Sequence, residues 1–397
     1  MNILWALFAM ALGSFGGTSS VAPDLGHSNN SQLSSLSNSF NSAIIQSQKE
    51  QVVVDADNPP AKVDPQPDAP VVKGIYVTAY SAGGARMAQL LELTDQTELN
   101  AMVIDIKDDL GYITYPTKNK AVNNMGEAKA FIQDINALMK RLEKHKVYPI
   151  ARVVVFKDTI LAKKNPELSF RNKDGSVWAN GKGDSFVNPY SKEVWEYNIE
   201  IAKEAAKLGF KEIQFDYVRF PEGFETRADK LKYTQTKQSR VDVVAEFVQY
   251  ARKELAPLGV RVSVDIFGYA ASVPAAEGIG QDFVKISENV DVISPMVYPS
   301  HYSTGWYGVK DPDKDPYTTI KGSMKDTHKK LDPTKELKPI IRPWIQDFTA
   351  SWLGRGHYIK YGKKQVEDQI KAMKEMNVDE YLLWNASNRY TPGVQYK

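Results

Sequence analysis

The stretch "EIQFDYVRFPEG", residues 212–223, has the composition of a buried strand that ends in charged residues. Its apolar start is followed, within seven residues, by Asp216, Arg219 and Glu222 among aromatic side chains. A carboxylate buried at the end of an apolar strand costs free energy unless it is paired or has a chemical role. The meaning of this charge depends on how the other strands of the chain end.

Seven further runs have a similar composition, and most are nearly continuous in apolar residues, as parallel strands covered on both faces are. Together with 212–218, the predicted strands are 74–80, 101–106, 148–156, 261–269, 291–298, 338–345 and 380–386. Between them, apolar residues recur with helical spacing. The predicted helices cover 131–142, 195–206, 244–255 and 366–373, with less regular patterns at 85–93 and 317–331.

Strands that alternate with helices predict a single (β/α)8 TIM barrel with elaborated loops. A doubly wound open sheet is the alternative. Only eleven residues follow Ala386, so we expect the eighth helix to be missing or replaced by the N-terminal segment. The barrel domain is predicted to span residues 71–397.

The N-terminal region has a different composition from the barrel domain. Residues 1–20 contain a short apolar run that resembles the apolar part of a secretory signal or an anchor, although no Lys or Arg precedes Lys49. Residues 21–70 are rich first in Ser, Asn and Gln and then in Pro and Asp, which predicts a disordered linker. We therefore expect a secreted or surface-attached protein, with the N-terminus as the candidate point of membrane or cell-wall association.

The overall composition excludes several classes of function. The 50 basic and 48 acidic residues among 397 give a net charge of +2, which does not favour a nucleic-acid partner. The chain has no cysteine, which excludes disulfides, thiolate metal sites and cysteine nucleophiles. Its five histidines are scattered along the chain, so we predict neither a metal site nor a cofactor. An oligomeric state does not follow from the sequence.

Carboxylates and aromatic side chains gather where the predicted strands end, which is the functional face of a TIM barrel. Tryptophan faces suit stacking against pyranose rings, although any single Trp has core packing as its alternative. Glycoside hydrolysis uses two carboxyl groups: one protonates the leaving oxygen, and the other attacks the anomeric carbon or activates water. The sequence therefore indicates a glycosidase that acts on an oligo- or polysaccharide.

Asp216 is the predicted nucleophile or base, Asp265 the first candidate for the acid and Glu222 the second. The structural alternatives are a salt bridge between Asp216 and Arg219 and a hydrogen-bonded structural role for Asp265. Asp109, in the loop after the second strand, is expected to be solvated. The residues predicted to orient the sugar and tune the carboxylates are Asp105, Arg152, Arg219, Tyr298, Arg342, Trp344, Trp384 and Asn385.

Three stretches, "IQFDYVRFPEG", "VIDIKDDLG" and "SPMVYPSHY", resemble the glycoside hydrolase family once named domain of unknown function 4015. This family belongs to the glycosyl-hydrolase-like TIM barrels related to the alpha-amylase clan. The resemblance covers about residues 72–390 and implies a (β/α)8 fold, an extracellular or envelope setting and carbohydrate hydrolysis. It also implies a catalytic Asp at the end of the fourth strand, which matches Asp216. Related barrels place a Glu acid on the fifth strand, where this chain has Asp265.

The leading interpretation is a secreted or surface-anchored glycoside hydrolase that cleaves a cell-envelope or extracellular polysaccharide. A non-catalytic glycan-binding barrel and an intracellular barrel enzyme acting on a small metabolite are the alternatives. We expect Asp216 and Asp265 to point into the mouth of the barrel at a spacing near the ~5–5.5 Å of retaining enzymes. If Asp265 points away, Glu222 becomes the acid.

Overall fold

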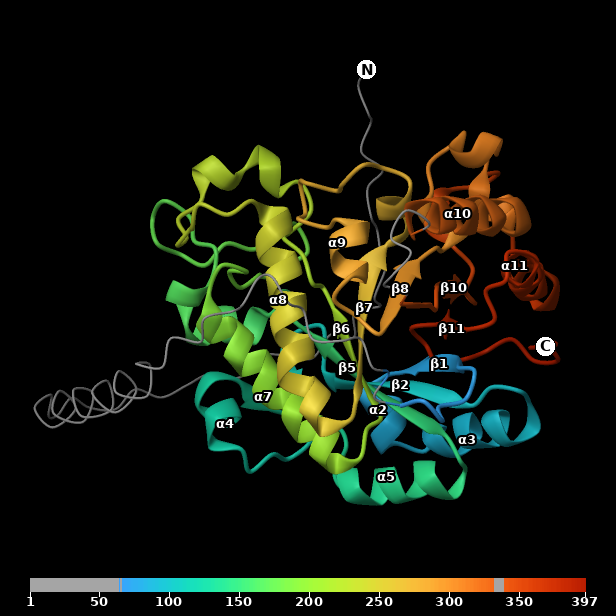
Figure 1. The fold of residues 1–397 in the computed structure, drawn as a ribbon, viewed down its shortest axis with the longest axis horizontal. Helices are drawn as coiled ribbons and strands as arrows, with labels where there is room; N and C mark the ends of the chain where they lie inside the picture. Colours follow the sequence, from blue (N-terminus) through green and yellow to red (C-terminus); the bar gives the residue numbers. More distant parts are fainter. Residues whose placement is uncertain (1–63, 65, 332–338) are drawn as a thin grey trace, which may run out of the picture. The chain divides into compact units, whose positions relative to one another are not determined.

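The computed structural model describes residue 64 and residues 66–331 and 339–397. Its strands form a closed parallel barrel (Figure 1), in which β1 pairs with both β2 and β11. Of eleven strands, β3 and β4 extend β2 outside the ring, and β9 and β10 occupy one position, which leaves eight positions. The ring strands are β1 (Lys73–Val77), β2 (Ala101–Lys107), β5 (Tyr148–Val154), β6 (Glu212–Asp216), β7 (Arg261–Phe267), β8 (Val292–Met296), β9 (Ile340–Ile341), β10 (Trp344–Gln346) and β11 (Tyr381–Trp384). The predicted (β/α)8 barrel is confirmed, and the open sheet is excluded.

The seventh strand position is split by Pro343. Both β9 and β10 pair with β8, and β10 also pairs with β11. Proline has no backbone N–H, so it cannot donate to the ladder. The strand is therefore interrupted at Arg342 and Pro343, while Arg342 still donates its backbone N–H to Ile293 and Pro343 still accepts from Leu382.

Helices alternate with these strands as the apolar stripes predict. They are α2 (Ala79–Gly83), α3 (Arg86–Gln96), α4 (Lys120–Met125), α5 (Ile135–Lys144), α6 (Thr159–Lys164), α7 (Lys192–Leu208), α8 (Arg240–Leu255), α9 (Phe283–Ser287), α10 (Pro316–Leu331) and α11 (Lys363–Glu375). The two short strands outside the ring are β3 (Tyr112–Ile113) and β4 (Glu127–Ala128). Residues 385–397, which follow the last strand, contain no helix.

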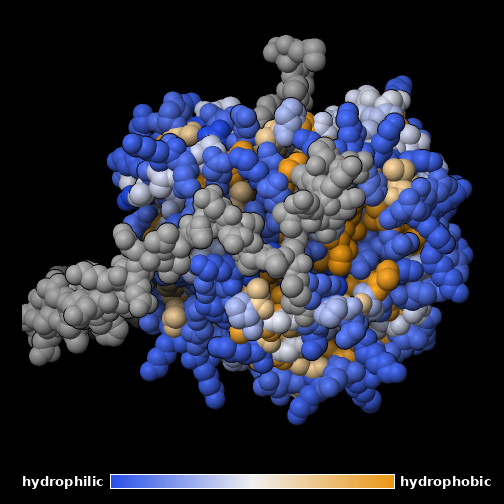
Figure 2. All heavy atoms as spheres, viewed as in Figure 1, coloured by the Kyte–Doolittle hydropathy of each residue, from blue (hydrophilic) through white to orange (hydrophobic). Residues whose placement is uncertain are grey.

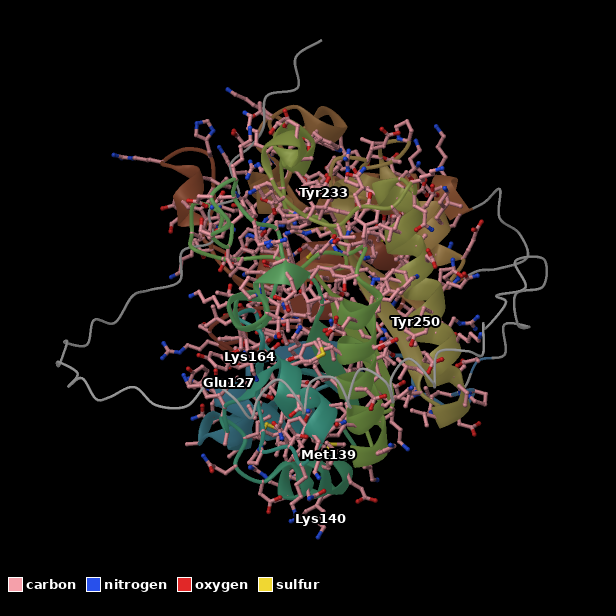
Figure 3. The ribbon with its side chains drawn as sticks, turned by 90° about the vertical axis from the view of Figure 1, so that its left-hand side faces the viewer. Glu127, Met139, Lys140, Lys164, Tyr233 and Tyr250 are labelled. Carbon is pink, nitrogen blue, oxygen red and sulfur yellow. The ribbon has the colours of Figure 1, made fainter. Side chains whose placement is uncertain are left out.

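The apolar stripes predict the correct helices, but the capping residues decide where each helix begins and ends. The stripe that begins at Phe131 becomes a helix only from Ile135, because Asp134 caps α5 by accepting from the backbone N–H of Ala137. Gly209 ends α7 with φ 106°, a left-handed conformation that suits glycine. Figure 3 shows Met139 and Lys140 of α5 at the opposite end of the view from Tyr233, in the loop after β6.

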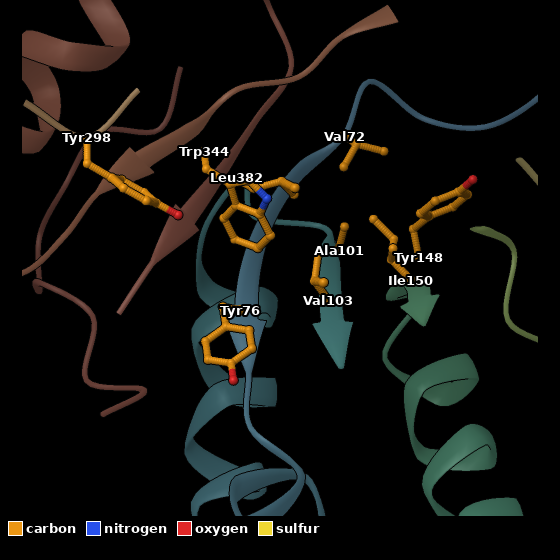
Figure 4. Close-up of a cluster of buried hydrophobic side chains, with 9 residues drawn as sticks. All are labelled: Val72, Tyr76, Ala101, Val103, Tyr148, Ile150, Tyr298, Trp344 and Leu382. Atoms are coloured by element: carbon orange, nitrogen blue, oxygen red, sulfur yellow. The ribbon is translucent and has the colours of Figure 1, made fainter. Parts of the chain in front are cut away.

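The barrel interior has an apolar part and a polar part. A cluster of buried side chains from several strands (Figure 4) includes Tyr76, Tyr148, Tyr298 and Trp344. Gln214 of β6 donates to Ser294 of β8, two strands away, so both side chains point into the barrel. On the face drawn in Figure 2, hydrophilic side chains cover most of the surface and hydrophobic ones gather toward the middle.

Contacts to the barrel begin before residue 71. Asp64 accepts two hydrogen bonds from the guanidinium of Arg261, at 2.9 and 2.5 Å, and the backbone carbonyl of Gln66 accepts a third. The part of the chain that packs on the barrel therefore starts earlier than the predicted boundary. The signal-like segment 1–20 and most of the predicted linker lie outside the described residues, and within the described part no helix is long and apolar enough to cross a membrane.

Candidate active site

Asp216 is the last residue of β6, and its carboxylate turns toward β5. Arg152 donates to Oδ2 from Nη2 at 2.6 Å and from Nε at 3.1 Å, and the backbone N–H of Tyr217 donates to Oδ1 at 2.6 Å. Tyr217 has φ 51°, which is uncommon for a residue other than glycine. A guanidinium and a backbone amide together are the partners that suit an ionised carboxylate.

Arg152 joins three carboxylates. Besides Asp216, it donates to Asp105 at 2.7 Å and to Asp109 at 2.8 Å, and its own side chain is 1% exposed. The hydroxyl of Tyr76 donates to the second oxygen of Asp105 at 2.6 Å. Burial raises the pKa of Asp105 to about 6, although the positive charge of Arg152 opposes this rise. Arg152 is therefore the electrostatic centre of the site.

Asp265 lies beside Asp216 on the next strand. The register of β6 and β7 pairs Phe215 with Val264, so Asp216 and Asp265 follow as the next two facing residues. Neighbouring strands are about 4.8 Å apart. The indole N–H of Trp344 donates to Asp265 at 2.7 Å, which directs this carboxyl group into the barrel interior.

Asp216 and Asp265 differ in their electrostatic surroundings. Burial and the negative charge of Asp216 raise the pKa of Asp265 well above its usual value, although Trp344 opposes this rise by stabilising the carboxylate. No guanidinium contacts Asp265 among the described residues, whereas Asp216 is bound by Arg152. A carboxylate beside a carboxyl group that stays protonated is the division of roles that glycosidases use.

Aromatic rings surround these carboxylates. The rings of Tyr76 and half-buried Trp384 stack with centroids 4.0 Å apart, and the guanidinium carbon of Arg152 lies 5.6 Å from each. On the side of β8 and β10, Tyr298 packs edge-on against Phe348, and Phe348 stacks on Trp352 at 5.7 Å. Trp352 is 38% exposed, so its ring is accessible.

The structure brings together Asp216, Asp265, Asp105, Arg152, Tyr298 and Trp384, whose roles in catalysis and sugar binding stay predictions. Arg219 pairs with Glu222 at 2.9 Å and not with Asp216, so the structural salt bridge considered for Asp216 has Arg152 as its partner instead. The Glu222 side chain is 43% exposed. Arg219 also lies 4.8 Å from the ring of Tyr217.

Trp344 does not offer a stacking face. It is 1% exposed and lies edge-on to Tyr76 at 6.5 Å and to Trp384 at 5.4 Å, within the buried cluster of Figure 4. The expectation that Trp344 stacks on a sugar is corrected: its ring is packed in the core, and its indole N–H donates to Asp265 and positions that carboxyl group.

Asn385 is also corrected. Its amide nitrogen donates to the carbonyls of Asp347 and Arg389, and its amide oxygen accepts from the backbone N–H and the hydroxyl of Ser387. One amide donor therefore reaches the segment after β10, at Asp347, and the other donor and both acceptor positions are engaged within the loop after β11. Asn385 shapes this loop and has no polar group left for a sugar hydroxyl.

Arg342 lies in another part of the barrel. It donates to Glu212, the first residue of β6, at 2.7 and 2.9 Å, and to Glu380 at 2.6 Å. Arg342 and Glu212 are fully buried, and Asp216 lies at the other end of β6. The expectation that Arg342 orients sugar hydroxyls is corrected, because the ion pair holds it at the amino end of the strands.

We expect the Arg342→Met substitution to lower the free energy of unfolding by about 3–5 kcal/mol, because it leaves Glu212 as an uncompensated buried charge. The KM of the folded molecules should not change. Chemical denaturation and kinetics measured on the same preparation check this, with the Arg342→Met and Glu212→Gln double variant as the control that recovers stability. An unchanged free energy of unfolding together with a raised KM would show instead that Arg342 binds the substrate.

Sequence reasoning missed three residues near the carboxylates, Asp109, Tyr217 and Tyr76. Asp109 is not simply solvated, since it binds Arg152 and lies 4.0 Å from Lys157. Tyr217 lies between Lys157 and Arg219, each 4.8 Å from its ring. Tyr76 occupies an inward-facing position of β1, and alternation along that strand was the signal that could have identified it. The left-handed backbone of Tyr217 has no signal in the sequence.

The described residues contain no group of three or more His, Asp or Glu side chains that could hold a metal ion. The three carboxylates around Arg152 are bound by its guanidinium instead.

A closed (β/α)8 barrel with two neighbouring carboxyl groups where its strands end is an arrangement that TIM-barrel glycoside hydrolases use. The model of a family described as "Putative glycosyl hydrolase domain", the domain of unknown function 4015, matches residues 74–390. The chain belongs to this glycosyl hydrolase family, as the three sequence stretches predict.

Three solved structures with some likeness to the chain have TM-scores below 0.5. A hypothetical protein from Ruminiclostridium thermocellum is 36% identical over 48% of this chain and 96% of its own, with a TM-score of 0.44. The maltogenic alpha-amylase AmyB from Thermotoga neapolitana is 13% identical, covers 80% of this chain and 67% of its own, and has a TM-score of 0.46. A chitinase from Chromobacterium violaceum is 14% identical over 81% of this chain and 94% of its own, with a TM-score of 0.44. No curated protein matches the chain.

Proposed function

We propose that this glycoside hydrolase cleaves a cell-envelope or extracellular polysaccharide with retention of anomeric configuration. Asp216 is the nucleophile and Asp265 the general acid. The observation that carries this proposal is the pair of neighbouring carboxyl groups with opposite surroundings. Asp216 accepts from Arg152 and from the Tyr217 amide, whereas burial and the charge of Asp216 raise the pKa of Asp265.

The reaction has two steps. Asp265 donates its proton to the glycosidic oxygen as the bond from this oxygen to the anomeric carbon breaks, and an oxygen of Asp216 bonds to that carbon. Asp265, now a carboxylate, then removes a proton from a water molecule that attacks the same carbon and releases Asp216. The two steps consume one water and return both carboxyl groups to their starting states.

A chain of sugars, and not a single small metabolite, is supported by the aromatic side chains beyond the carboxylates. Trp384 lies beside Arg152, and Phe348 and Trp352 extend the aromatic surface past Tyr298. Rings at successive distances from the reacting bond suit successive pyranose units. The signal-like residues 1–20 support the proposed location outside the cytoplasm.

The proposal is tested by incubating the protein with a panel of bacterial polysaccharides and following the products by ¹H NMR. We expect reducing ends that appear first with the anomeric configuration of the substrate. An inverted first product would contradict the nucleophilic role of Asp216. Tight binding without any cleavage would favour the glycan-binding alternative.

We expect activity to fall as the pH rises through the pKa of Asp265, because the acid must be protonated. Replacing Trp344 with Phe removes the N–H that stabilises the Asp265 carboxylate, so the pKa of Asp265 rises and this alkaline limb moves up by about 0.5–1 pH unit. The profile of kcat/KM against pH measures the shift, and Phe keeps much of the aromatic packing as a built-in control. A limb that stays in place would show that Trp344 does not act on the acid.

A further inference from the structure

A hollow lies outside the carboxylate cluster, between the segments that follow β7 and β8. Its volume is about 480 Å³, and it is lined by Ser272, Thr304, Gly305, Trp306, Tyr307 and Asp326. This volume lies in the range of small-molecule sites, about 300–1,000 Å³. None of the lining residues belongs to the group around Arg152.

The loop that forms the hollow has an unusual backbone. Gly305, Tyr307 and Gly308 have φ of 86°, 55° and 78°, so three of four consecutive residues are left-handed. For Tyr307, which is not a glycine, this costs about 1–3 kcal/mol and persists only where the surroundings enforce it. Such strain occurs preferentially at ligand sites, and Tyr307 directly follows Trp306 at the hollow.

Two contacts from the surrounding fold hold Tyr307. Its hydroxyl lies 2.9 Å from the hydroxyl of Ser272, and its ring covers Gly322 of α10 so closely that a Cβ there would meet the ring at 2.4 Å. Trp306 packs edge-on against buried Tyr302 at 5.6 Å. The surrounding fold therefore holds Tyr307 and Trp306 in their places at the hollow.

The chemistry of the lining suits a sugar. Trp306 is half-buried and offers an aromatic surface, and the exposed hydroxyl of Thr304 lies in the same lining. Asp326 of α10 accepts no hydrogen bond and forms no ion pair with any described residue, although it is only partly exposed. A free carboxylate accepts from sugar hydroxyls, an aromatic ring stacks on a pyranose, and the negative charge disfavours acidic sugars.

We infer that this hollow is a second glycan-binding site, which binds a neutral pyranose unit of a polysaccharide at a distance from the reacting bond. The inference rests on the proposed function for the identity of its ligand. Strand β7 leads into both sites, since Asp265 lies on β7 and Ser272 of the hollow follows it. A long chain could thus be anchored on the same enzyme that cleaves it.

The test compares polymer and short substrates in the full chain. For Trp306→Ala and, separately, Asp326→Asn, we expect kcat/KM on a cleaved neutral polysaccharide to fall about tenfold, the loss typical of one stacking or charge-assisted contact. The kcat/KM on the matching p-nitrophenyl glycoside should not change. Asp326→Asn is nearly isosteric, so it provides the test if Trp306→Ala lowers the stability of the protein. Trp178→Ala is the matched control, because Trp178 is also half-buried in a loop but has Arg227 5.4 Å from its ring.

Unchanged polymer cleavage in both variants would overturn the second site, and so would equal losses on the polymer and the short glycoside. If the wild type cleaves no polysaccharide, electrophoresis of the Asp216→Asn chain through gels that contain the same polysaccharides decides the question. Retardation that Trp306→Ala abolishes would support the site although the proposed function had failed. No retardation in any gel would overturn the site as well.

Discussion

The Asp216→Asn enzyme is expected to lose at least about 10³-fold in kcat while its fold and its affinity for glycans are kept. Asparagine has nearly the same shape, but it lacks the carboxylate oxygen that attacks the anomeric carbon. Without this nucleophile the covalent intermediate cannot form. The loss should appear in kcat and not in KM. Single-turnover kinetics on the cleaved polysaccharide measures it, together with thermal melting of both proteins.

Asp109→Asn is the matched control for this prediction. Asp109 accepts from the same nitrogen of Arg152 as Asp216 does, at 2.8 and 2.6 Å, so both substitutions remove one negative charge from one guanidinium. We expect Asp109→Asn to stay within about tenfold of the wild-type kcat, since Asp109 does not reach the anomeric carbon in the proposed reaction. If Asp216→Asn keeps more than about a tenth of the activity, under ~1.4 kcal/mol of transition-state stabilisation, Asp216 is not the catalytic carboxylate.

The second large effect is expected for Asp265→Asn. Loss of the acid should lower kcat/KM about 10²–10⁴-fold on a polysaccharide, whose leaving hydroxyl needs a proton. On an aryl glycoside with a strongly acidic leaving phenol the first step should be nearly unaffected, because this group departs without a proton. The alkaline limb of the pH profile should also disappear. The dependence of the rate on the pKa of the leaving group is the measurement.

Glu222→Gln separates the two acid candidates. Glu222 is bound to Arg219 at 2.9 Å and is partly exposed, whereas Asp265 is buried beside Asp216. We therefore expect Glu222→Gln to behave like the wild type with every leaving group. A strong dependence on the leaving group in Glu222→Gln, and none in Asp265→Asn, would make Glu222 the acid.

The fold could be predicted because its signals are local. Parallel strands buried on both faces need continuous apolar runs, and the helices that cover them need apolar stripes. The order of strands and helices can therefore be predicted from the sequence. Boundaries depend on caps such as Asp134, which moves the start of α5 to Ile135. A single residue, Pro343, interrupts the strand between β9 and β10, whereas the sequence predicts one continuous strand over 338–345.

The site was only partly predictable, because its contacts cross the barrel. Asp216 and Asp265 could be found as charges within buried strands, and Arg152 as a cation near them. Arg342 has the same appearance in sequence, but its guanidinium meets Glu212, at the other end of β6 from Asp216. Trp344 shows the same limit, since only the three-dimensional packing reveals that its N–H faces Asp265 and its ring is buried.

Chemical rescue is the direct test of whether Asp216 is the nucleophile of a retaining glycoside hydrolase. In Asp216→Ala, azide can enter the space of the lost carboxylate and attack the anomeric carbon from the same face, while Asp265 protonates the leaving oxygen. We predict that azide restores the cleavage of an aryl glycoside and that ¹H NMR shows a glycosyl azide of inverted configuration. Rescue with a retained configuration would instead identify Asp216 as the acid. Full activity of Asp216→Ala without azide would contradict any catalytic role for this residue.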